Sequence, residues 1–242
     1  MCTIAIWHRV HPTFPLIVAA NRDELYARRF RPPEVIAPGV VAGVDELAGG
    51  TWMGATAAGF FAGLTNVRPP AGADRSKRSR GALVADVLRA GSTAAARAWL
   101  AACDPRDTNP FFLLFGDADG LRVAASPYGA TAITIREVAP GMHVLPNGPL
   151  DATVFPKVAR VAELVPDATL PETELVPALS RMLGDHALAE AAPLASLCVH
   201  TPVYGTGSAT ILLLGEGLTL RYLFAPGPPC TTRLDDVTEL LR

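Results

Sequence analysis

The 242-residue sequence has no long hydrophobic run and no recognisable leader segment. No stretch reaches the roughly 18 apolar residues that a membrane-spanning helix needs. The first residues carry no basic segment, and Pro12, Pro15 and the polar cluster at Asn21–Glu24 interrupt the apolar core that a secretory signal requires. We therefore expect no membrane span, and a cytoplasmic location.

The sequence also lacks an excess of charge of either sign. It has 21 lysines and arginines against 23 acidic residues, a formal net charge of −2. Its one basic run, Asp74–Gly81, is short, and we interpret it as a solvated loop rather than a phosphate contact. This balance favours neither a nucleic acid nor an acidic membrane surface as a partner.

Cysteine is scarce and scattered. The four cysteines, Cys2, Cys103, Cys198 and Cys230, form no CxxC pair and show no Cys/His pair at metal-ligand spacing. A disulfide framework is unusual in a chain this long and this apolar. We therefore expect no metal site and no cofactor, and we interpret Cys103 and Cys198 as small buried hydrophobic residues. Cys2 differs from them because it lies directly after the initiator methionine.

Short apolar segments and helical segments alternate in blocks along the chain. The pattern predicts strands or hairpins at 3–8, 15–20, 49–66, 111–126, 130–138, 143–147, 196–203, 208–215 and 218–226. It predicts helices at 80–91, 92–103, 153–165 and 171–185, the second beginning after an N-cap at Ser92 or Thr93. Hairpins dominate, without strict alternation of strand and helix. This order indicates an α+β fold of antiparallel sheets with helices packed outside, as one domain over residues 1–242.

The first two strands bring the start of the chain beside the polar cluster. With the turn at Pro12–Thr13, the numbers of opposing residues sum to about 25, which places Asp23 opposite Cys2. Side chains alternate along a strand, so Cys2, Asn21 and Asp23 would share one face and Arg22 would lie on the other. A shift of the register by one residue would exchange Asp23 and Arg22.

Removal of Met1 would give Cys2 both a thiol and a free α-amine. An α-amine has an ordinary pKa of roughly 7.7 to 8.0 and can act as a base near neutral pH. One residue would then supply nucleophile and base, as in enzymes with an N-terminal threonine. Asp23 would hold and orient the ammonium group. The alternative is that Cys2 is only the first residue of a strand.

Five segments together resemble the NRDE (transport and Golgi organisation protein 2-like) family, named for its Asn-Arg-Asp-Glu signature. They are MCTIAIW, LIVAANRDE, AGGTWMGATAAGFFAGLTN, RGALV and VYGTGSATILLL. That family is similar to the N-terminal nucleophile hydrolases, above all to choloylglycine hydrolases and penicillin V acylases. The resemblance implies a four-layer αββα sandwich of two mainly antiparallel sheets with outer helices.

The resemblance also implies roles for individual residues. Cys2 corresponds to the nucleophile, and Asp23 to the acid that contacts the amine of the nucleophile. Asn66 and Asn147 correspond to asparagines that form the oxyanion hole. Trp52, within GGTWMG, would wall the pocket beside Cys2, although a place in the core is an equally good interpretation of this side chain.

Two positions depart from the related sequences. The amidases carry an arginine where this chain has Ala20, and Arg22 is the nearest candidate to replace it in substrate binding. The family commonly has an arginine where this chain has Gly207, and the adjacent Ser208 offers a hydroxyl group to a substrate. The departure at Gly207 weakens the expectation of strong binding to a substrate carboxylate.

These observations lead to one main functional hypothesis and two alternatives. The first is a cysteine hydrolase or acyltransferase that acts on an amide or other acyl bond of a small molecule. The second is a non-catalytic binding or trafficking protein for haem, a lipid or an acyl-coenzyme A. Haem would need an axial ligand, for which His8, His143, His200 and Cys2 are the candidates. A structural partner in a larger assembly is the third.

Overall fold

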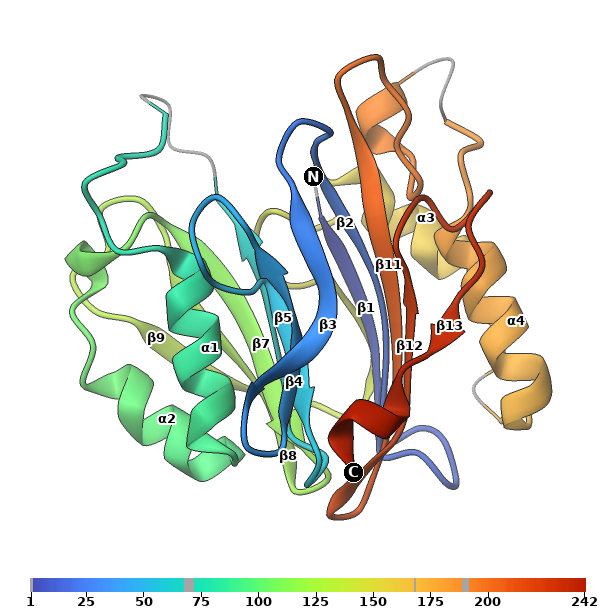
Figure 1. Cartoon of the computed structure of the whole chain (residues 1–242), viewed down its shortest axis with the longest axis horizontal. Helices are drawn as coiled ribbons and strands as arrows, with labels where there is room; N and C mark the ends of the chain where they lie inside the picture. The colour runs from blue at the N-terminus through green and yellow to red at the C-terminus, as the bar shows by residue number, and fades with distance from the viewer. Residues whose placement is uncertain (1, 68–71, 168, 189–191) are drawn as a thin grey trace.

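The computed structural model describes residues 2–67, 72–167, 169–188 and 192–242. Within these residues the strands form two antiparallel sheets that face each other, and helices cover both outer faces (Figure 1). The expected four-layer αββα sandwich is therefore confirmed. Met1, on whose removal the catalytic hypothesis depends, lies outside the described residues.

The first sheet begins with β1 (Thr3–His8) and β2 (Leu16–Leu25) and includes β10 (Gly141–Leu145). Its remaining strands are β11 (Tyr204–Gly215), β12 (Leu218–Ala225) and the short β13 (Asp235–Asp236), and the strand order is β10-β1-β2-β11-β12-β13. The N-terminal and C-terminal parts of the chain thus lie in one sheet, since β2 pairs with both β1 and β11.

The second sheet follows the order of the chain. It consists of β3 (Phe30–Ala37), β4 (Val40–Asp45), β5 (Met53–Thr56), β6 (Phe61–Asn66), β7 (Phe111–Asp117), β8 (Gly120–Ser126) and β9 (Thr134–Val138). Every strand therefore pairs with its immediate neighbour in sequence, which is the simplest arrangement for a series of hairpins.

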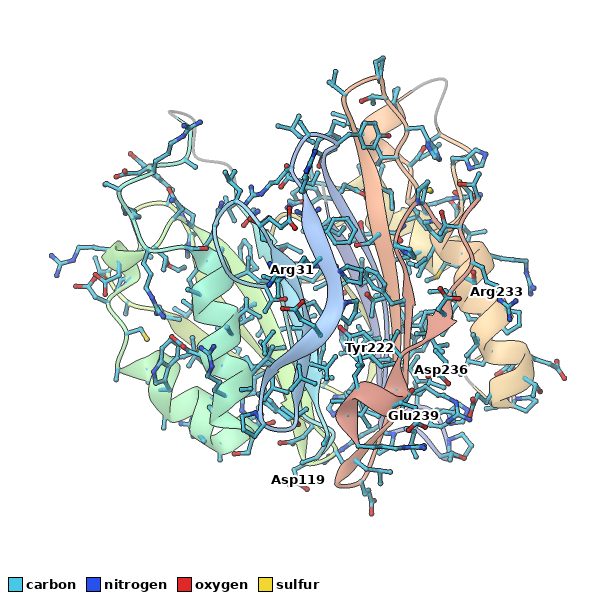
Figure 2. The ribbon with its side chains drawn as sticks, viewed as in Figure 1. Arg31, Asp119, Tyr222, Arg233, Asp236 and Glu239 are labelled. Carbon is cyan, nitrogen blue, oxygen red and sulfur yellow. The ribbon has the colours of Figure 1, made fainter. Side chains whose placement is uncertain are left out.

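Strands at the centre of the sandwich are buried on both faces, which explains their continuous apolar sequences. Along β1, Ile4 and Ile6 pack between the two sheets, whereas Ala5 and Trp7 pack against the helices. Tyr222 of β12 is also buried between the sheets, and burial raises the pKa of its phenol. Figure 2 shows Tyr222 in the interior and charged side chains such as Asp119 at the periphery.

Four helices in the described residues form the outer layers. α1 (Arg80–Ala90) and α2 (Thr93–Ala101) cover the second sheet, and α3 (Pro156–Leu164) and α4 (Glu172–Leu183) cover the first (Figure 1). The Ser92 side chain caps α2 by accepting a hydrogen bond from the backbone N–H of Ala95, so the first of the two expected N-caps is correct. None of these helices is long and apolar enough to cross a membrane.

Two strands, β3 and β4, occupy a region to which the sequence pattern assigned no element. Pro32 and Pro33 made β3 hard to predict, because proline has no backbone N–H to donate to a neighbouring strand and a segment with two prolines therefore looks like a loop. β3 tolerates them because it lies at the edge of the second sheet, and its register with β4 shifts between Arg31 and Glu34. Proline here marks an edge strand rather than a loop.

The prediction of a strand at 196–203 is wrong. Only an isolated bridge between His200 and Gly205 forms there, and β11 begins at Tyr204. The segment instead folds back on the start of β11, where the Val199 carbonyl accepts a hydrogen bond from the Thr206 backbone N–H at 2.9 Å. The backbone hydrogen-bonding groups of this segment are therefore satisfied by a reversal of the chain and not by pairing with a neighbouring strand.

The start of α1 packs backbone to backbone against the loop before β5. The Thr51 N–H donates to the Gly81 carbonyl at 3.1 Å, and a Cβ built on Gly50 would lie 2.4 Å from the carbonyl carbon of Gly81. Two of the segments that carry the family resemblance, AGGTW and RGALV, therefore meet through their glycines.

We expect Gly50→Ala to lower the free energy of unfolding by about 1–3 kcal/mol, the usual cost of overpacking. The clash is with backbone atoms, which cannot rotate away. Gly120→Ala is the matched control, because its Cβ would meet only the flexible Arg122 guanidinium, at 3.5 Å. Urea unfolding of both variants measures the difference, and equal stabilities would contradict the close packing.

Candidate functional site

The register of the first hairpin differs by one residue from the register we expected. Thr3 pairs with Asn21 and Ile4 with Ala20, so opposing numbers sum to 24. When this register is continued by one residue, Cys2 lies opposite Arg22 on the neighbouring strand and is not opposite Asp23. The expectation that Arg22 lies on the far side from Cys2 is therefore wrong, because the connection between the strands is centred one half-residue earlier than Pro12–Thr13.

Four of the seven predicted site residues form a row across the first sheet. Ser208 of β11 pairs with Arg22 of β2, and the register of β1 with β2 continues the row to Cys2. On the other side, Ile4 pairs with Leu145, and this register extends to Cys2 beside Asn147. By strand alternation all four side chains lie on the face that the first sheet turns toward the second.

The Cys2 thiol is half-buried and held by the polypeptide backbone. Its Sγ donates to the backbone carbonyl of Asp23 over 3.7 Å. Burial raises the pKa of the Cys2 thiol, and the Asp23 charge acts in the same direction, while Arg22 acts to lower it. The thiol is therefore protonated at neutral pH, and a nucleophilic Cys2 needs a base.

The Asp23 carboxylate lies on the opposite face of the sheet, under the helices. Its Oδ2 is 2.6 Å from Nζ of Lys157 in α3, and its Oδ1 accepts a hydrogen bond from Thr206 at 2.6 Å. Both members of the Asp23–Lys157 pair are almost fully buried. The backbone carbonyl of Asp23 accepts a hydrogen bond from the Tyr204 hydroxyl at 3.0 Å. Asp23 thus joins the start of the chain to α3 and β11.

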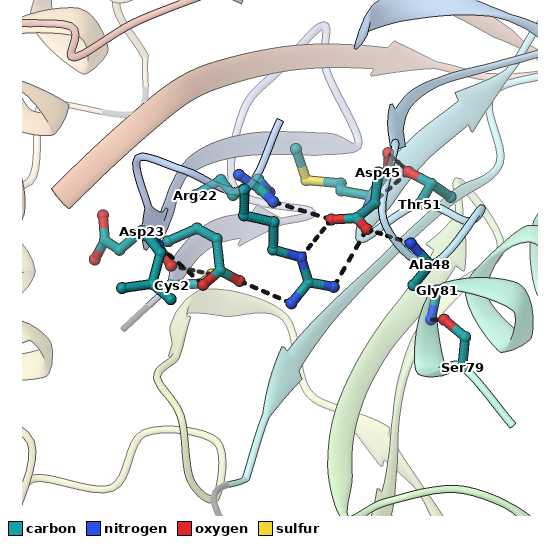
Figure 3. A network of polar contacts seen from close by, with 12 residues as sticks. Cys2, Arg22, Asp23, Asp45, Ala48, Thr51, Ser79 and Gly81 are labelled. Atoms are coloured by element: carbon teal, nitrogen blue, oxygen red, sulfur yellow. Dashed lines mark hydrogen bonds and ion pairs between the residues drawn. The ribbon is translucent and has the colours of Figure 1, made fainter. Parts of the chain in front are cut away.

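Arg22 enters a network of charges between the two sheets (Figure 3). Its Nη2 lies 3.2 Å from Oδ2 of Asp45, at the end of β4. Arg28 binds the same carboxylate through Nε at 2.7 Å and Nη2 at 3.3 Å. The Arg22 guanidinium also lies over the Phe30 ring, 5.3 Å from its centroid. Asp45 therefore fixes both arginines beside Cys2.

A third arginine lies close to this network. Arg80, the first residue of α1, donates hydrogen bonds to the carbonyls of Val67 at 3.3 Å and Pro110 at 2.9 Å. Burial, and then the neighbouring charge of Arg28, lower the pKa of Arg80 to about 10, so it stays protonated at neutral pH. Glu24 forms an ion pair with Arg28 at 3.3 Å, and its negative charge acts to raise the pKa of Arg80.

The two predicted oxyanion residues meet across the sheets. Asn147 Nδ2 donates to the backbone carbonyl of Asn66, the last residue of β6, at 2.7 Å. Asn147 Oδ1 is buried and finds no hydrogen-bond partner in the described part of the chain. Next to them, the Thr65 hydroxyl donates to the Pro146 carbonyl at 2.6 Å. The contact therefore joins the Asn147 amide group to the backbone of Asn66 and uses one of the two hydrogens of that amide.

The other substrate-binding candidates line the same face less directly. Trp52 is half-buried and packs against the core between the sheets. Ser208 is buried, and Gly207 before it forms a β-bulge, since the pairing of β11 with β2 shifts between Thr206 and Ser208. A Cβ on Gly207 would lie 3.9 Å from the Arg22 guanidinium, so this position opens toward Arg22 without a clash.

Sequence reasoning missed the charged partners of Asp23 and Arg22. Lys157 could have been found, because it shares the buried side of α3 with Val158 and Val161, and a lysine on the apolar face of a helix needs a partner. Asp45 carried no comparable signal. Its role depends on β3 and β4, which the sequence pattern did not reveal.

A shallow hollow of about 330 Å³ lies beside the buried ion pair, lined by Phe155–Lys157 and by Ala192–Ala195. Its walls are apolar except for Lys157. It belongs to the helix-covered side of Asp23, whereas Cys2 and Arg22 face the second sheet.

Two of the histidines considered as haem ligands are already engaged. His8 is buried, with Nδ1 3.1 Å from the Ala139 carbonyl oxygen, and burial lowers its pKa. His143 Nδ1 lies 2.7 Å from Asp151 Oδ2, and this hydrogen bond raises the pKa of His143.

The fold is similar to that of N-terminal nucleophile hydrolases whose structures have been solved. A mutant of the conjugated bile acid hydrolase from Clostridium perfringens superimposes with a TM-score of 0.61 at 12% identity, covering 99% of this chain and 93% of that one. Penicillin V acylase from Agrobacterium tumefaciens gives 0.52 at 15% identity, with 99% and 87% covered. An N-acylethanolamine-hydrolyzing acid amidase ortholog from Caenorhabditis elegans gives 0.54 at 14% identity, with 88% and 92% covered. At these identities the likeness shows the fold alone.

The chain belongs to the Transport and Golgi organisation 2 family, which matches residues 1–223. The Transport and Golgi organization protein 2 homolog of Bos taurus is 28% identical over 228 residues, which cover 83% of this chain and 82% of the relative. The Homo sapiens homolog is 25% identical with the same coverage. The resemblance drawn from the sequence motifs is confirmed.

We expect Asp45→Asn to destabilise the protein at neutral pH by on the order of 3 kcal/mol, because a buried guanidinium loses its counter-charge. Burial alone would raise the pKa of Asp45, but Arg28, Ala48 N–H and Arg22 hold it below its ordinary value. This contribution is fully present above the unfolded pKa of roughly 3.9 and is lost as the pH falls through the lower folded pKa. The gap between wild type and variant should therefore close in strong acid.

Urea unfolding at several pH values measures this gap. Glu34→Gln is the control, because the Arg31–Glu34 pair has the same chemistry but side chains 49% and 42% exposed. Its effect should stay within about 1 kcal/mol at every pH. A pH-independent loss in Asp45→Asn would show that the carboxylate charge is not what stabilises this network.

Proposed function

We propose that the protein is a cysteine hydrolase or acyltransferase that cleaves an amide or other acyl bond of a small molecule. One observation carries the proposal: Cys2 lies in a single row with Asn147, Arg22 and Ser208, on a scaffold of the N-terminal nucleophile hydrolase type.

Removal of Met1 frees the α-amine of Cys2, and this amine is the base. It accepts the proton of the Cys2 thiol as the sulfur attacks the carbonyl carbon of the substrate. The tetrahedral intermediate collapses to a thioester on Cys2, and the ammonium returns its proton to the departing amine. Water, or an acceptor nucleophile, then attacks the thioester and regenerates the thiol.

Asn66 and Asn147 are the proposed donors to the oxyanion. Asn147 Nδ2 carries two hydrogens, of which the Asn66 carbonyl uses one. The second remains for the substrate. Arg22, fixed by Asp45, supplies a positive charge on the same face, where negative charge develops on the substrate oxygen.

Asp23 is the proposed anchor of the α-amine. A carboxylate offers about four lone-pair sites, so Asp23 can hold an ammonium in addition to Lys157 and Thr206. The Asp23 carbonyl holds the thiol of Cys2 at the same time. Both functional groups of Cys2 would then be oriented by one residue of β2, through its backbone on one side and its carboxylate on the other.

A non-catalytic binding protein on the same scaffold, for haem, a lipid or an acyl-coenzyme A, is the second candidate. It is favoured by the apolar hollow beside Lys157. The two candidates differ in their products, because a carrier releases its ligand unchanged.

We expect Cys2→Ala to abolish turnover while the protein keeps its fold. Fluorogenic N-acyl amides and activated acyl esters of increasing chain length are the probes, and intact mass detects both the loss of Met1 and an acyl group on Cys2. Cys103→Ala is the matched control, since Cys103 lies at the end of α2, away from the row. Equal turnover by wild type and Cys2→Ala would refute the proposal, and unmodified ligand recovered from both would favour the carrier.

A second variant separates the thiol from the amine. Insertion of a lysine between Met1 and Cys2 blocks removal of Met1, so the nitrogen of Cys2 stays in a peptide bond. The rate of acyl transfer should fall by about 10²–10⁴-fold, the usual contribution of a general base. An unchanged rate would assign the base to another group.

A further inference from the structure

Four potential metal ligands meet on the outer side of the first sheet, apart from the row around Cys2. His186 lies just after α4, Cys198 and His200 lie in the segment that leads into β11, and Cys230 lies between β12 and β13. They come from three separate parts of the chain. Nothing in the proposed reaction uses them.

Their ligand atoms are crowded together. Cys198 Sγ lies 3.6 Å from Cys230 Sγ and 3.4 Å from His200 Nε2, and His200 Nε2 lies 3.2 Å from Cys230 Sγ. The ligand atoms of His186, His200 and Cys230 all lie within 4.8 Å of one another. All four cysteines of the chain are free thiols.

The separations among Cys198 Sγ, Cys230 Sγ and His200 Nε2 are close to the edges of a zinc coordination shell, and His186 approaches His200 and Cys230 as the fourth ligand. With Zn–S near 2.3 Å and Zn–N near 2.0–2.1 Å, a regular tetrahedron has edges of about 3.8 Å between two sulfurs and about 3.6 Å between sulfur and nitrogen. We propose that Cys198, Cys230, His200 and His186 form a structural Cys2His2 site for a single Zn²⁺ ion. The proposal is independent of the catalytic one.

Neighbouring backbone groups prepare the ligands for such a site. His186 Nδ1 lies 3.0 Å from the Gly184 carbonyl oxygen, which fixes the ring so that Nε2 is free for a metal. The Cys198 backbone N–H donates to the Asp185 carbonyl at 2.8 Å, so the chain before His186 is tied to Cys198. A Cβ on Gly184 would lie 3.3 Å from Cys230 Cα, and the third segment therefore packs against the same turn.

A cysteine binds zinc as the thiolate, so metal binding releases the proton of the thiol. Zinc would displace the protons of both thiols, as it does in other thiolate sites, and two thiolates with two neutral imidazoles leave the site electrically neutral.

Four protein ligands close the coordination shell, which is the arrangement of structural rather than catalytic zinc. The ion would clip the end of α4, the segment before β11 and the connection from β12 to β13. The proposed zinc site is also connected by hydrogen bonds to Asp23, next to the row around Cys2. Val199, between two ligands, donates its N–H to the Thr206 hydroxyl at 2.8 Å, and that hydroxyl donates to Asp23 at 2.6 Å.

The test uses untagged full-length protein, reduced and stripped with EDTA, because a histidine tag would itself bind the metal. Titration with Co²⁺ alone should give one ion per chain and a thiolate-to-cobalt charge-transfer band, which an equivalent of Zn²⁺ abolishes. Zinc should raise the thermal midpoint of unfolding. Cys230→Ser and His200→Asn should weaken zinc binding by more than the about 10–100-fold that the loss of a mere outer-shell partner causes.

Cys103→Ser is the matched control and should keep the band and the stoichiometry. His186→Asn provides a second variant at an exposed ligand, where loss of folding is not a concern. Absence of a thiolate band in the reduced wild type would overturn the proposal. So would a band that survives Cys230→Ser, or a stable disulfide between Cys198 and Cys230 with no metal bound after reduction and refolding.

Discussion

The ladder that joins β1 to β2 and β10 determines where each polar side chain near Cys2 points. Since alternate residues of a strand face opposite sides, one register places Cys2, Arg22 and Asn147 toward the second sheet and Asp23 toward the helices. The apolar residues that follow enforce this choice. A slip by one residue would turn Ile4 and Ile6 toward the helices and Trp7 into the space between the sheets. The core therefore holds the site in register.

Burial of charge at the two faces follows from this arrangement. Arg22 faces a second sheet and needs a counter-charge there, which Asp45 supplies from the end of β4. Asp23 faces the helices and finds Lys157 and Thr206. Each pair joins the first sheet to the layer that covers it, and breaking either would leave a buried charge without compensation. The beginning of the chain is thus attached to both neighbouring layers by ion pairs rather than by apolar contacts alone.

Much of the sandwich could be predicted from the sequence, because its central strands are apolar, its helices are amphipathic, and two of the helices begin at a serine N-cap. β3 escaped prediction because prolines conceal an edge strand, and 196–203 was misassigned because an apolar segment next to a reversal resembles a strand. At the site, residue types and motifs predicted roles for Cys2 and Asn147, but a half-residue error in the position of a turn exchanged the faces of Arg22 and Asp23. The proposed zinc ligands follow no linear spacing, since Cys230 and His186 approach His200 only through the fold.

The bulge at Gly207 does more than accommodate a small residue. In a regular strand, Thr206 and Ser208 would face the same way; here one extra residue lets Thr206 bind Asp23 under the helices while Ser208 stands beside Arg22 on the inner side. Position 207 is therefore the one place in this stretch of β11 that has no partner in β2. A larger side chain at 207 has open space before it, and a deletion of that single position would make Thr206 and Ser208 neighbours in a regular ladder, each still opposite its present partner in β2.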